Sequence, residues 1–209
     1  MIIAVDGPTA SGKGTIAKAL AAHFGLPHLD TGLLYRAVGR QVALDGGDPD
    51  SEADALVASA FPDALLTDPE LRSEEVGGLA SRVSVHPKVR QALFDRQRQF
   101  ALQPGGAVLD GRDIATVIAP EAEVKLFVVA SIPARAERRF REMQQAGRHV
   151  TLAEITADLE ARDLRDATRS AAPLVQAEGA IVLDTSLLSP EEAIARAIDF
   201  AQLQSATKG

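Results

Sequence analysis

The sequence predicts an α/β fold in which helices flank a five-stranded parallel sheet. Short apolar segments alternate with segments of helical periodicity, which is typical of a parallel sheet covered on both faces. A glycine-rich loop follows the first apolar segment and precedes the first helical one. The five expected strands lie near residues 2–5, 27–29, 107–109, 124–130 and 180–183.

The first part of the chain reads as strand, loop and helix. Ile2–Val5 is an apolar, partly β-branched run that ends at glycine, which predicts a buried strand. Residues 16–24 carry apolar side chains at helical spacing, and Gly25 follows as the expected helix terminus. After the second strand, a helix is expected over residues 33–44, before a pair of glycines.

The middle of the chain is less regular. Residues 48–75 are acidic, rich in alanine and interrupted by three prolines, so helical pieces and loops are expected there. Residues 65–75 show no alternation of apolar and polar residues, and hence no strand is predicted within them. Later helices are expected over residues 76–83, 88–102, 133–145, 152–168 and 190–203.

Composition limits the classes of function. The 209 residues carry a net charge of −7, which disfavours sequence-independent binding to nucleic acid. No apolar stretch approaches the ~20 residues needed to span a bilayer, and no signal peptide is recognisable, so a cytoplasmic protein without membrane partners is expected. The absence of cysteine agrees with this expectation. Arginines nevertheless gather in the second half, which favours a small, highly charged anion as ligand.

The glycine-rich loop Gly7-Pro8-Thr9-Ala10-Ser11-Gly12-Lys13 matches the phosphate-binding pattern G-x-x-x-x-G-K. It lies between a predicted strand and a predicted helix, as this motif requires. Glycines allow the backbone N–H groups to surround an anion, the helix N-terminus adds positive charge, and Lys13 adds a cation. Gly14 takes the place of the usual hydroxyl residue, and Thr15 follows it. The loop predicts an ATP site, with Thr15 as a candidate Mg²⁺ ligand.

The strand ends define where the ligands are expected. In an open parallel sheet, ligands bind at the carboxyl ends of the strands. Each expected strand is followed there by a polar residue or by glycine, and these residues should converge on one edge: Gly7, Asp30, Asp110, Ser131 and Asp184.

Four further segments resemble the bacterial cytidylate kinases, a family of P-loop nucleoside monophosphate kinases. They are Leu29-Asp30-Thr31-Gly32-Leu33-Leu34-Tyr35-Arg36, Val89-Arg90-Gln91-Ala92-Leu93, Asp110-Gly111-Arg112-Asp113 and the run from Ala161 to Arg169, followed by Ala172-Pro173-Leu174. The resemblance extends from the first strand to the last helix. It implies transfer of a phosphoryl group from ATP to CMP or dCMP, with Mg²⁺ and in a monomeric enzyme.

The resemblance also divides the chain. It implies a core of about residues 1–30, 84–145 and 170–209, a nucleotide-binding insertion of about 31–83, and a lid of about 146–169. The family often carries a strand-rich insertion, whereas this one is expected to be short and without strands.

By resemblance, specific residues take roles in this reaction. The ATP phosphates would lie in the loop Gly7–Thr15, and Asp110 would act on Mg²⁺ through water. Arginine matches phosphate oxygens with a planar fork of donors, and cytosine offers both donors and acceptors to a carboxylate, a guanidinium and a hydroxyl. The residues expected at CMP are Thr31, Arg36, Ser81, Arg90, Arg112, Asp113, Arg162, Asp166 and Arg169; those expected to act in catalysis are Lys13, Arg112, Arg162 and Arg169.

Taken without the resemblance, several of these residues have plainer interpretations. Arg36 could be a solvated arginine, and Asp110 could cap the adjoining loop. Arg162, Asp166 and Arg169 lie on one helix face, where salt bridges facing solvent are the alternative. Ser81 could be an ordinary polar helix position.

The residue that contacts the donor adenine is left open, and no chemical role is assigned to the histidines. The resemblance places an arginine against the donor adenine, and Arg138 and Arg139 are both candidates. The four histidines, His23, His28, His86 and His149, have no metal-ligand spacing and are expected to be structural or exposed.

Three alternative functions remain. Another small-molecule P-loop kinase, acting on UMP, AMP or shikimate, would keep the loop and change the acceptor. A switch ATPase or GTPase would lack the acceptor arginines and carry a partner-binding surface or a guanine-reading N-K-x-D motif, and no N-K-x-D occurs. A nucleic-acid-binding module is disfavoured by the acidic charge and by the single tyrosine and absent tryptophan.

Overall fold

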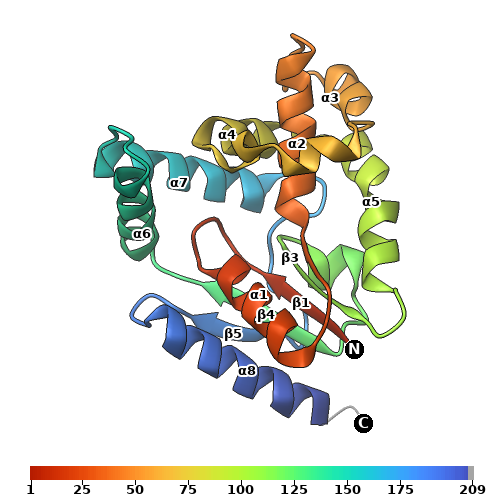
Figure 1. The fold of residues 1–209 in the computed structure, drawn as a ribbon, viewed down its shortest axis with the longest axis vertical. Helices are drawn as coiled ribbons and strands as arrows, with labels where there is room; N and C mark the ends of the chain where they lie inside the picture. Colours follow the sequence, from red (N-terminus) through yellow and green to blue (C-terminus); the bar gives the residue numbers. More distant parts are fainter. Residues whose placement is uncertain (207–209) are drawn as a thin grey trace.

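The computed structural model describes residues 1–206, and its centre is a five-stranded sheet in which every pairing is parallel, as predicted (Figure 1). The strand order β2-β3-β1-β4-β5 places β1 in the middle of the sheet. The last three residues of the predicted core, 207–209, lie outside the described residues. The strands are β1 (Ile2–Asp6), β2 (His28–Asp30), β3 (Ala107–Gly111), β4 (Val124–Val129) and β5 (Ile181–Asp184).

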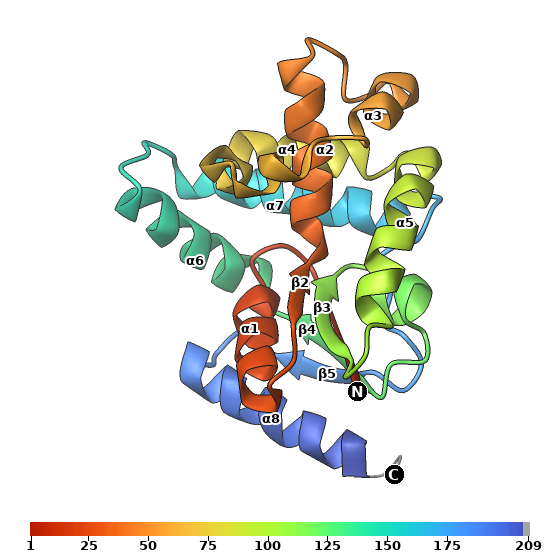
Figure 2. The ribbon, with the colours of Figure 1, turned by 45° about the vertical axis from the view of Figure 1, so that its right-hand side comes forward.

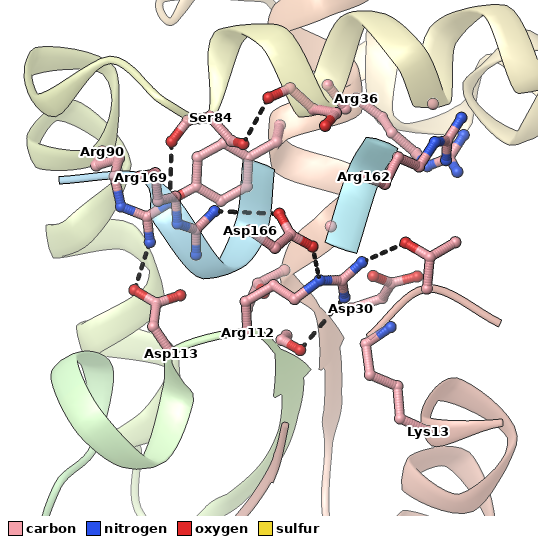
Figure 3. Close-up of a pocket in the computed structure, with 18 residues that line it drawn as sticks. Lys13, Asp30, Arg36, Ser84, Arg90, Arg112, Asp113, Arg162, Asp166 and Arg169 are labelled. Atoms are coloured by element: carbon pink, nitrogen blue, oxygen red, sulfur yellow. Dashed lines mark hydrogen bonds and ion pairs between the residues drawn. The ribbon is translucent and has the colours of Figure 1, made fainter. Parts of the chain in front are cut away.

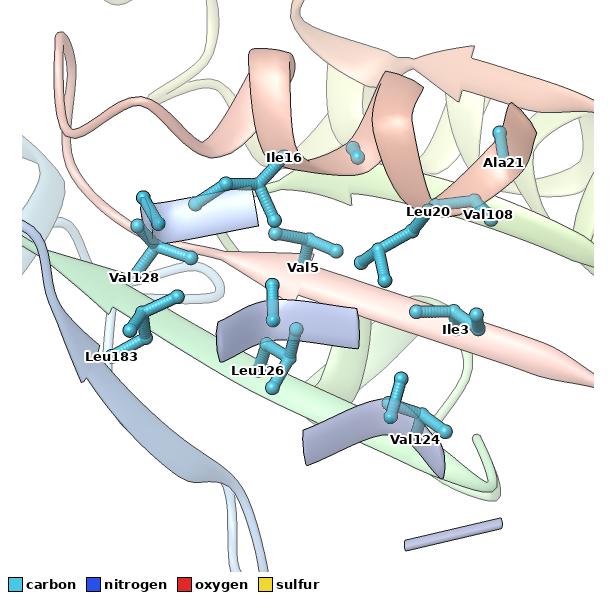
Figure 4. Packing of buried hydrophobic residues seen from close by; sticks show 14 residues of the cluster. Ile3, Val5, Ile16, Leu20, Ala21, Val108, Val124, Leu126, Val128 and Leu183 are labelled. Carbon is cyan, nitrogen blue, oxygen red and sulfur yellow. The ribbon is translucent and has the colours of Figure 1, made fainter. Parts of the chain in front are cut away.

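Both faces of β1 are covered, which explains why it has an apolar run where an exposed strand would alternate. Ile3 and Val5 pack against α1 (Lys13–Phe24) and α8 (Pro190–Ala206), together with Leu126 from β4 (Figure 4).

The opposite face carries a second apolar cluster. Ala4 and Leu109 pack there with Ala101, the last residue of α5 (Pro87–Ala101). The same cluster includes Ile114 and other residues of the short helix η3 (Ile114–Ile118).

A group of helices lies beyond the carboxyl edge of the sheet (Figure 2). It contains α2 (Thr31–Leu44), α3 (Glu52–Ala58) and α4 (Glu74–Val83), with 3₁₀ turns at η1 (Asp63–Thr67) and η2 (Pro69–Arg72). These elements share a hydrophobic cluster of their own, into which α5 also inserts Val89 and Leu93. The segment between α2 and α5 has no strand, which confirms the expectation of an insertion without strands.

Two further helices extend from the same edge. α6 (Ile132–Gln145) and α7 (Leu152–Thr168) pack through Ala136, Met143, Ile155 and Leu159. Thr151 and Glu154 form a capping box at the start of α7, in which the side chain of each accepts the other's backbone N–H. α7 lies alongside α4, so the two groups of helices meet above the sheet edge (Figure 1).

The structure departs from the expected elements in three places. α1 begins at Lys13 and α2 at Thr31, both earlier than their apolar periodicity indicates. The single-turn π-helix Ile114–Ile118 was not predicted, because a stretch of five residues is too short to show a helical period. Within residues 1–206 the structure contains no helix with the length and apolar character that crossing a membrane requires.

We expect Leu126→Ala to lower the free energy of unfolding by about 2–5 kcal/mol, because it leaves a cavity between the sheet and its helices. Leu126 is fully buried (0% exposed), whereas Leu187 is 96% exposed and offers the same substitution without a cavity. Leu187→Ala should change stability by less than about 0.5 kcal/mol. Chemical denaturation of both variants measures the difference, and equal losses would contradict this account of the core.

Candidate active site

The loop between β1 and α1 has the backbone shape of a phosphate-binding loop. Gly7 adopts φ 156°, and a Cβ built on it would lie 2.1 Å from the carbonyl oxygen of Val128 on the neighbouring strand. Ala10 and Gly12 have φ values of 60° and 91°, in the left-handed region that residues other than glycine rarely adopt. Strain of this kind is concentrated at functional sites.

A pocket opens beside this loop at the carboxyl edge of the sheet (Figure 3). Residues from the loop, α2, α4, α5, β3 and α7 line it, although they are far apart in the sequence. All nine residues expected at CMP are among them, so the structure brings the predicted acceptor residues together. The lining residues are Thr9, Lys13, Asp30, Thr31, Gly32, Tyr35, Arg36, Gly77, Ala80, Ser81, Ser84, Arg90, Gly111, Arg112, Asp113, Arg162, Asp166 and Arg169.

The pocket has two chemically different ends. Figure 3 shows Lys13, Arg36 and Arg162 at one end, and the pair Arg90 and Asp113 at the other. The first end is cationic and adjoins the glycine-rich loop, so it suits phosphates. The second end presents paired donors and acceptors, so it suits a polar ring.

Lys13 is the first residue of α1 and lines the cationic end. Burial lowers its pKa to about 8, and the neighbouring Arg112 acts in the same direction. Asp110, Asp30 and Asp166 oppose this shift without cancelling it. Burial destabilises the charged form of this lysine, and an anionic ligand would stabilise it again. Lys13 therefore favours an anion as its ligand.

Arg112 joins the loop to α7. Its Nη2 donates to Thr9 Oγ1 at 2.6 Å, and its Nε donates to Asp166 Oδ2 at 2.7 Å. Burial alone would lower the pKa of Arg112, but Asp166 and Asp110 outweigh burial and raise it. The pKa of Asp166 is lowered in return, mainly because Arg112 and Arg169 outweigh the effect of its own burial.

Arg36 and Arg162 meet the oxygen atoms of residues 71–74. Arg36 Nη1 donates to the carbonyl oxygens of Leu71 at 2.7 Å and Ser73 at 2.9 Å. Arg162 pairs with Glu74 at 3.2 Å. Burial lowers the pKa of Arg36 to about 10, and the nearby guanidinium of Arg162 contributes to the shift. The cations of this end therefore raise one another's free energy.

Arg169 lines the pocket and has one donor without a partner among residues 1–206. Its Nε donates to the carbonyl oxygen of Ala172 at 2.8 Å, and its Nη1 lies 3.6 Å from Asp166 Oδ1. Its Nη2 is buried and has no hydrogen-bond partner among residues 1–206. A buried guanidinium N–H without a partner is costly unless a ligand accepts from it.

The polar end is organised around Arg90. This side chain forms an ion pair with Asp113, donates from Nη1 to the carbonyl oxygen of Ser84 at 3.2 Å, and lies 5.2 Å above the ring of Tyr35. Ser81 lines the same region, and its hydroxyl accepts from Arg165 Nε at 3.0 Å. A flat polar ring could thus be held by both hydrogen bonds and stacking.

The two candidate Mg²⁺ residues differ in their surroundings. Asp110 is buried within β3, and a Cβ built on Gly14 would lie 3.7 Å from its Oδ2. Thr15 is exposed and does not line the pocket. His28, expected to be structural or exposed, has a structural contact here: its Nε2 lies 2.7 Å from Asp110 Oδ1, so it orients this carboxylate. In residues 1–206 no group of three or more His, Cys, Asp or Glu side chains forms a metal site.

Arg138 and Arg139 point to different neighbours. Arg138 Nη1 donates to Thr185 Oγ1 at 3.1 Å, and that hydroxyl donates to the carbonyl oxygen of Ser11 in the loop. Arg139 instead forms ion pairs with Glu74 and Glu142. Arg138 is therefore the arginine that is linked to the outer side of the glycine-rich loop.

Sequence reasoning missed several residues of the site. Tyr35 lies in a segment that was recognised, but its ring was given no role. Glu74 gave no signal, because its importance depends on a pair with Arg162, which is distant in the sequence. Ser84 gave none because only its backbone carbonyl oxygen accepts from Arg90, and a backbone atom leaves no mark on the residue type. Asp163 was also missed; it forms an ion pair with Arg135, which donates to the loop at the carbonyl oxygen of Thr9.

The fold and the site define a P-loop nucleotide kinase, because a phosphate loop and a second, arginine-lined position share one pocket. The chain belongs to the cytidylate kinase family, whose model, described as cytidylate kinase, matches residues 3–203. A cytidylate kinase of Xanthobacter autotrophicus is 54% identical over 99% of both chains. One from Rhodopseudomonas palustris strain BisA53 is 55% identical over 97% of this chain and 96% of the relative.

A solved structure supports the fold alone. An uncharacterised protein from Eubacterium ventriosum superposes with a TM-score of 0.53, covering 97% of this chain and 98% of that one, at 15% identity. The overall arrangement is thus shared by a protein of very different sequence.

Gly7→Ala should lower kcat/KM for ATP by about 100-fold or more, because the added Cβ meets the Val128 carbonyl and displaces the loop that positions phosphates. The matched control is Gly78→Ala. Nothing lies within 4 Å of a Cβ built on Gly78 in α4. This control should retain the parent kinetics and gain up to about 1 kcal/mol of stability. Parent-like kinetics for a folded Gly7→Ala enzyme would contradict the assigned role of the loop.

Proposed function

We propose that this chain transfers the γ-phosphoryl group of ATP to the phosphate of CMP or dCMP in the pocket described above, giving ADP and CDP or dCDP. The observation that carries the assignment of the site is the single pocket in which Lys13 and the loop meet four arginines. Those arginines are Arg36, Arg112, Arg162 and Arg169. The family supports cytidine nucleotides as acceptor and ATP as donor.

The donor phosphates lie in the loop Gly7–Thr15. Backbone N–H groups of a loop with this shape, together with the N-terminus of α1, attract the phosphate charge. Lys13 contacts the outer phosphates. Arg138 lies against the donor adenine. Its link to the loop through Thr185 supports this placement.

The acceptor occupies the space between the insertion and α7. Thr31, Arg36, Arg112, Arg162 and Arg169 hold its phosphate, and the carboxylate of Asp166 accepts from the sugar hydroxyls. Asp113, Arg90 and Ser81 read the cytosine ring, with Tyr35 beneath it.

The reaction requires little covalent help from the protein. A phosphate oxygen of the acceptor attacks the γ-phosphorus, the bond from that phosphorus to the β,γ-bridging oxygen breaks, and ADP leaves. Lys13, Arg112, Arg162 and Arg169 stabilise the negative charge of the transferring group by being held in place before it moves.

Magnesium fits the carboxylate chemistry of the site. Mg²⁺ is usually bound through one or two carboxylates and the substrate phosphates, and Asp110 is a buried carboxylate that His28 orients beside the start of α1. Asp110 is therefore the residue that would hold the ion, through water. The ion, when bound, neutralises charge on the phosphates. Direct binding by Thr15 is less well supported, since this side chain is exposed.

Two parts of the chain are proposed to move during the cycle: the insertion, about residues 31–83, and the lid, about 146–169. The insertion packs in one hydrophobic cluster together with Val89 and Leu93 of α5, and the lid helix α7 packs with α6 in another. Both clusters are separate from those of the sheet, which supports movement of these helices relative to the sheet. Closure of the lid would exclude water from ATP and so limit hydrolysis. A cytoplasmic monomer remains the expectation from the family.

A coupled assay of ADP release tests the acceptor. We expect CMP and dCMP to be phosphorylated with kcat/KM at least about 10-fold above UMP and AMP, because Asp113, Arg90 and Ser81 match the polar edge of cytosine. Highest turnover with AMP, UMP or shikimate would reject the base assignment and keep the kinase. ATP hydrolysis without any small acceptor would instead favour a switch ATPase.

Lys13 should give the enzyme a pH dependence. Its ammonium group is charged below a pKa of about 8 and becomes neutral as the pH rises through that value in the free enzyme. Since kcat/KM reports the free enzyme, its value for ATP should fall above about pH 8, while kcat at saturation holds to higher pH because bound phosphates raise the lysine pKa.

Two variants isolate this group. Arginine stays charged at high pH, so in Lys13→Arg the fall of kcat/KM for ATP above about pH 8 should disappear, whatever the absolute rate of the variant. Lys18→Arg, at an exposed position of the same helix, should show the same fall of kcat/KM above about pH 8 as the parent enzyme. A parent profile that stays flat to pH 10 would show that Lys13 does not titrate as described.

A further inference from the structure

Asp6, the last residue of β1, has a buried carboxylate that takes no part in the proposed reaction. It lies directly before the glycine-rich loop and is 2% exposed. Its Oδ1 accepts from the backbone N–H of Ile114 at 2.9 Å, and its Oδ2 accepts from that of Ala115 at 2.8 Å. Both acceptor atoms are thus committed to the first turn of η3.

The segment that Asp6 holds follows directly on the residues that face the acceptor. Arg112 and Asp113 immediately precede η3, and Asp113 has φ −143° and ψ 25°, outside the helical region. The π-helix is hydrogen-bonded to Asp113, because the carbonyl oxygen of Asp113 accepts from the N–H of Val117 at 2.9 Å and from that of Ile118 at 3.2 Å. Short π-helices are rare and are frequently found at functional sites.

Further side-chain bonds to this segment come from the helices and the loop around it. Arg90 of α5 pairs with Asp113, and Asp166 of α7 and Thr9 of the glycine-rich loop accept from Arg112. Arg98 of α5 donates to the carbonyl oxygen of Ile118 at 2.9 Å. Asp6, by contrast, belongs to the central strand, where it is paired in register with Gly111 of β3. It therefore links the acceptor segment to the rigid sheet.

We propose that Asp6 is a positioning residue for recognition of the acceptor base, because its two carboxylate oxygens fix the turn that presents Asp113 and Arg112 to the pocket. This inference rests on the proposed roles of those two residues. It adds a determinant of selectivity that lies outside the pocket lining and on the strand that starts the ATP loop.

Keeping a carboxylate at this position is costly. Burial raises the pKa of Asp6 to about 6, in spite of the two backbone hydrogen bonds and Arg112, which act in the other direction; Asp113 adds to the rise. An apolar residue would avoid this cost but would leave two buried N–H groups without acceptors. The carboxylate is therefore suited to holding both donors at once.

Asp6→Asn is the direct test, since it keeps the size of the side chain and replaces one acceptor oxygen by an NH₂ group that faces a backbone donor. We expect kcat/KM for CMP to fall by about 10-fold, mainly through KM, and the preference for CMP over UMP to fall several-fold. KM for ATP should stay within about twofold of the parent, since the loop backbone is not bonded to this carboxylate.

Glu123→Gln provides the matched control. Glu123 Oε2 accepts from the backbone N–H of Ile2 at 2.6 Å, so it bonds the opposite end of the same strand. A general loosening of β1 would act on this variant as well. We expect Glu123→Gln to lose stability and to keep the parent ratio of CMP to UMP.

The outcomes separate the inference from the function on which it rests. A parent enzyme without preference for CMP would refute the base assignment itself. A selective parent together with a folded Asp6→Asn variant of unchanged CMP-to-UMP ratio, or with equal increases in KM for CMP and ATP, would overturn the positioning role alone. If Asp6→Asn does not fold, Ala115→Pro removes one of the two donors and leaves Asp6 intact, and the same selective loss is expected.

Discussion

Buried positive charge dominates the electrostatics around the pocket. Lys13, Arg36, Arg112, Arg162 and Arg169 all face it, and burial and mutual repulsion lower the pKa values of Lys13, Arg36 and Arg169. Carboxylates neutralise this positive charge only in part. Asp166 forms ion pairs with Arg112 and Arg169, and Glu74 forms one with Arg162. The folded chain thus stores unfavourable electrostatic energy that phosphate groups would relieve. Binding two nucleotides and drawing the surrounding helices together are then favoured by the same interaction.

The register of the sheet explains why the two ligand positions adjoin. Asp6 at the end of β1 pairs with Gly111 at the end of β3, so the glycine-rich loop and the segment of Arg112 and Asp113 leave the sheet side by side. Close packing fixes the two exits. A Cβ on Gly7 would meet β4, and a Cβ on Gly111 would lie 2.5 Å from Thr31 Oγ1. In-line transfer between two bound phosphates requires this proximity. The backbone register of the parallel sheet alone is sufficient to produce it.

Local patterns were sufficient for much of this structure. The five strands and the phosphate loop follow from apolar runs and from glycine spacing, because each depends on neighbours in the sequence. The acceptor residues were predicted through the family resemblance, since nothing local distinguishes Arg36 or Arg162 from a solvated arginine. Glu74 and the His28–Asp110 contact were missed because each becomes meaningful only when distant elements meet. Ser84 was missed because it acts through its backbone carbonyl oxygen, which the residue type does not reveal. The π-helix after Asp113 was missed for a related reason: its first donors depend on Asp6, more than a hundred residues earlier.

The distribution of hydrophobic clusters bears on how the pocket can change shape. The insertion and the α6–α7 pair have apolar clusters separate from those of the sheet, so either can shift without opening the central core. The contacts that connect these parts across the pocket are largely polar: Arg112 with Asp166, Arg162 with Glu74, and Arg90 with Asp113. Polar contacts can be exchanged for contacts with a phosphate at little net cost, whereas apolar packing cannot. α5 is the exception, because Val89 and Leu93 pack with α2, α3 and α4 while Ala101 packs under the sheet. α5 is therefore the element through which a shift of these helices would be transmitted to the sheet by apolar packing.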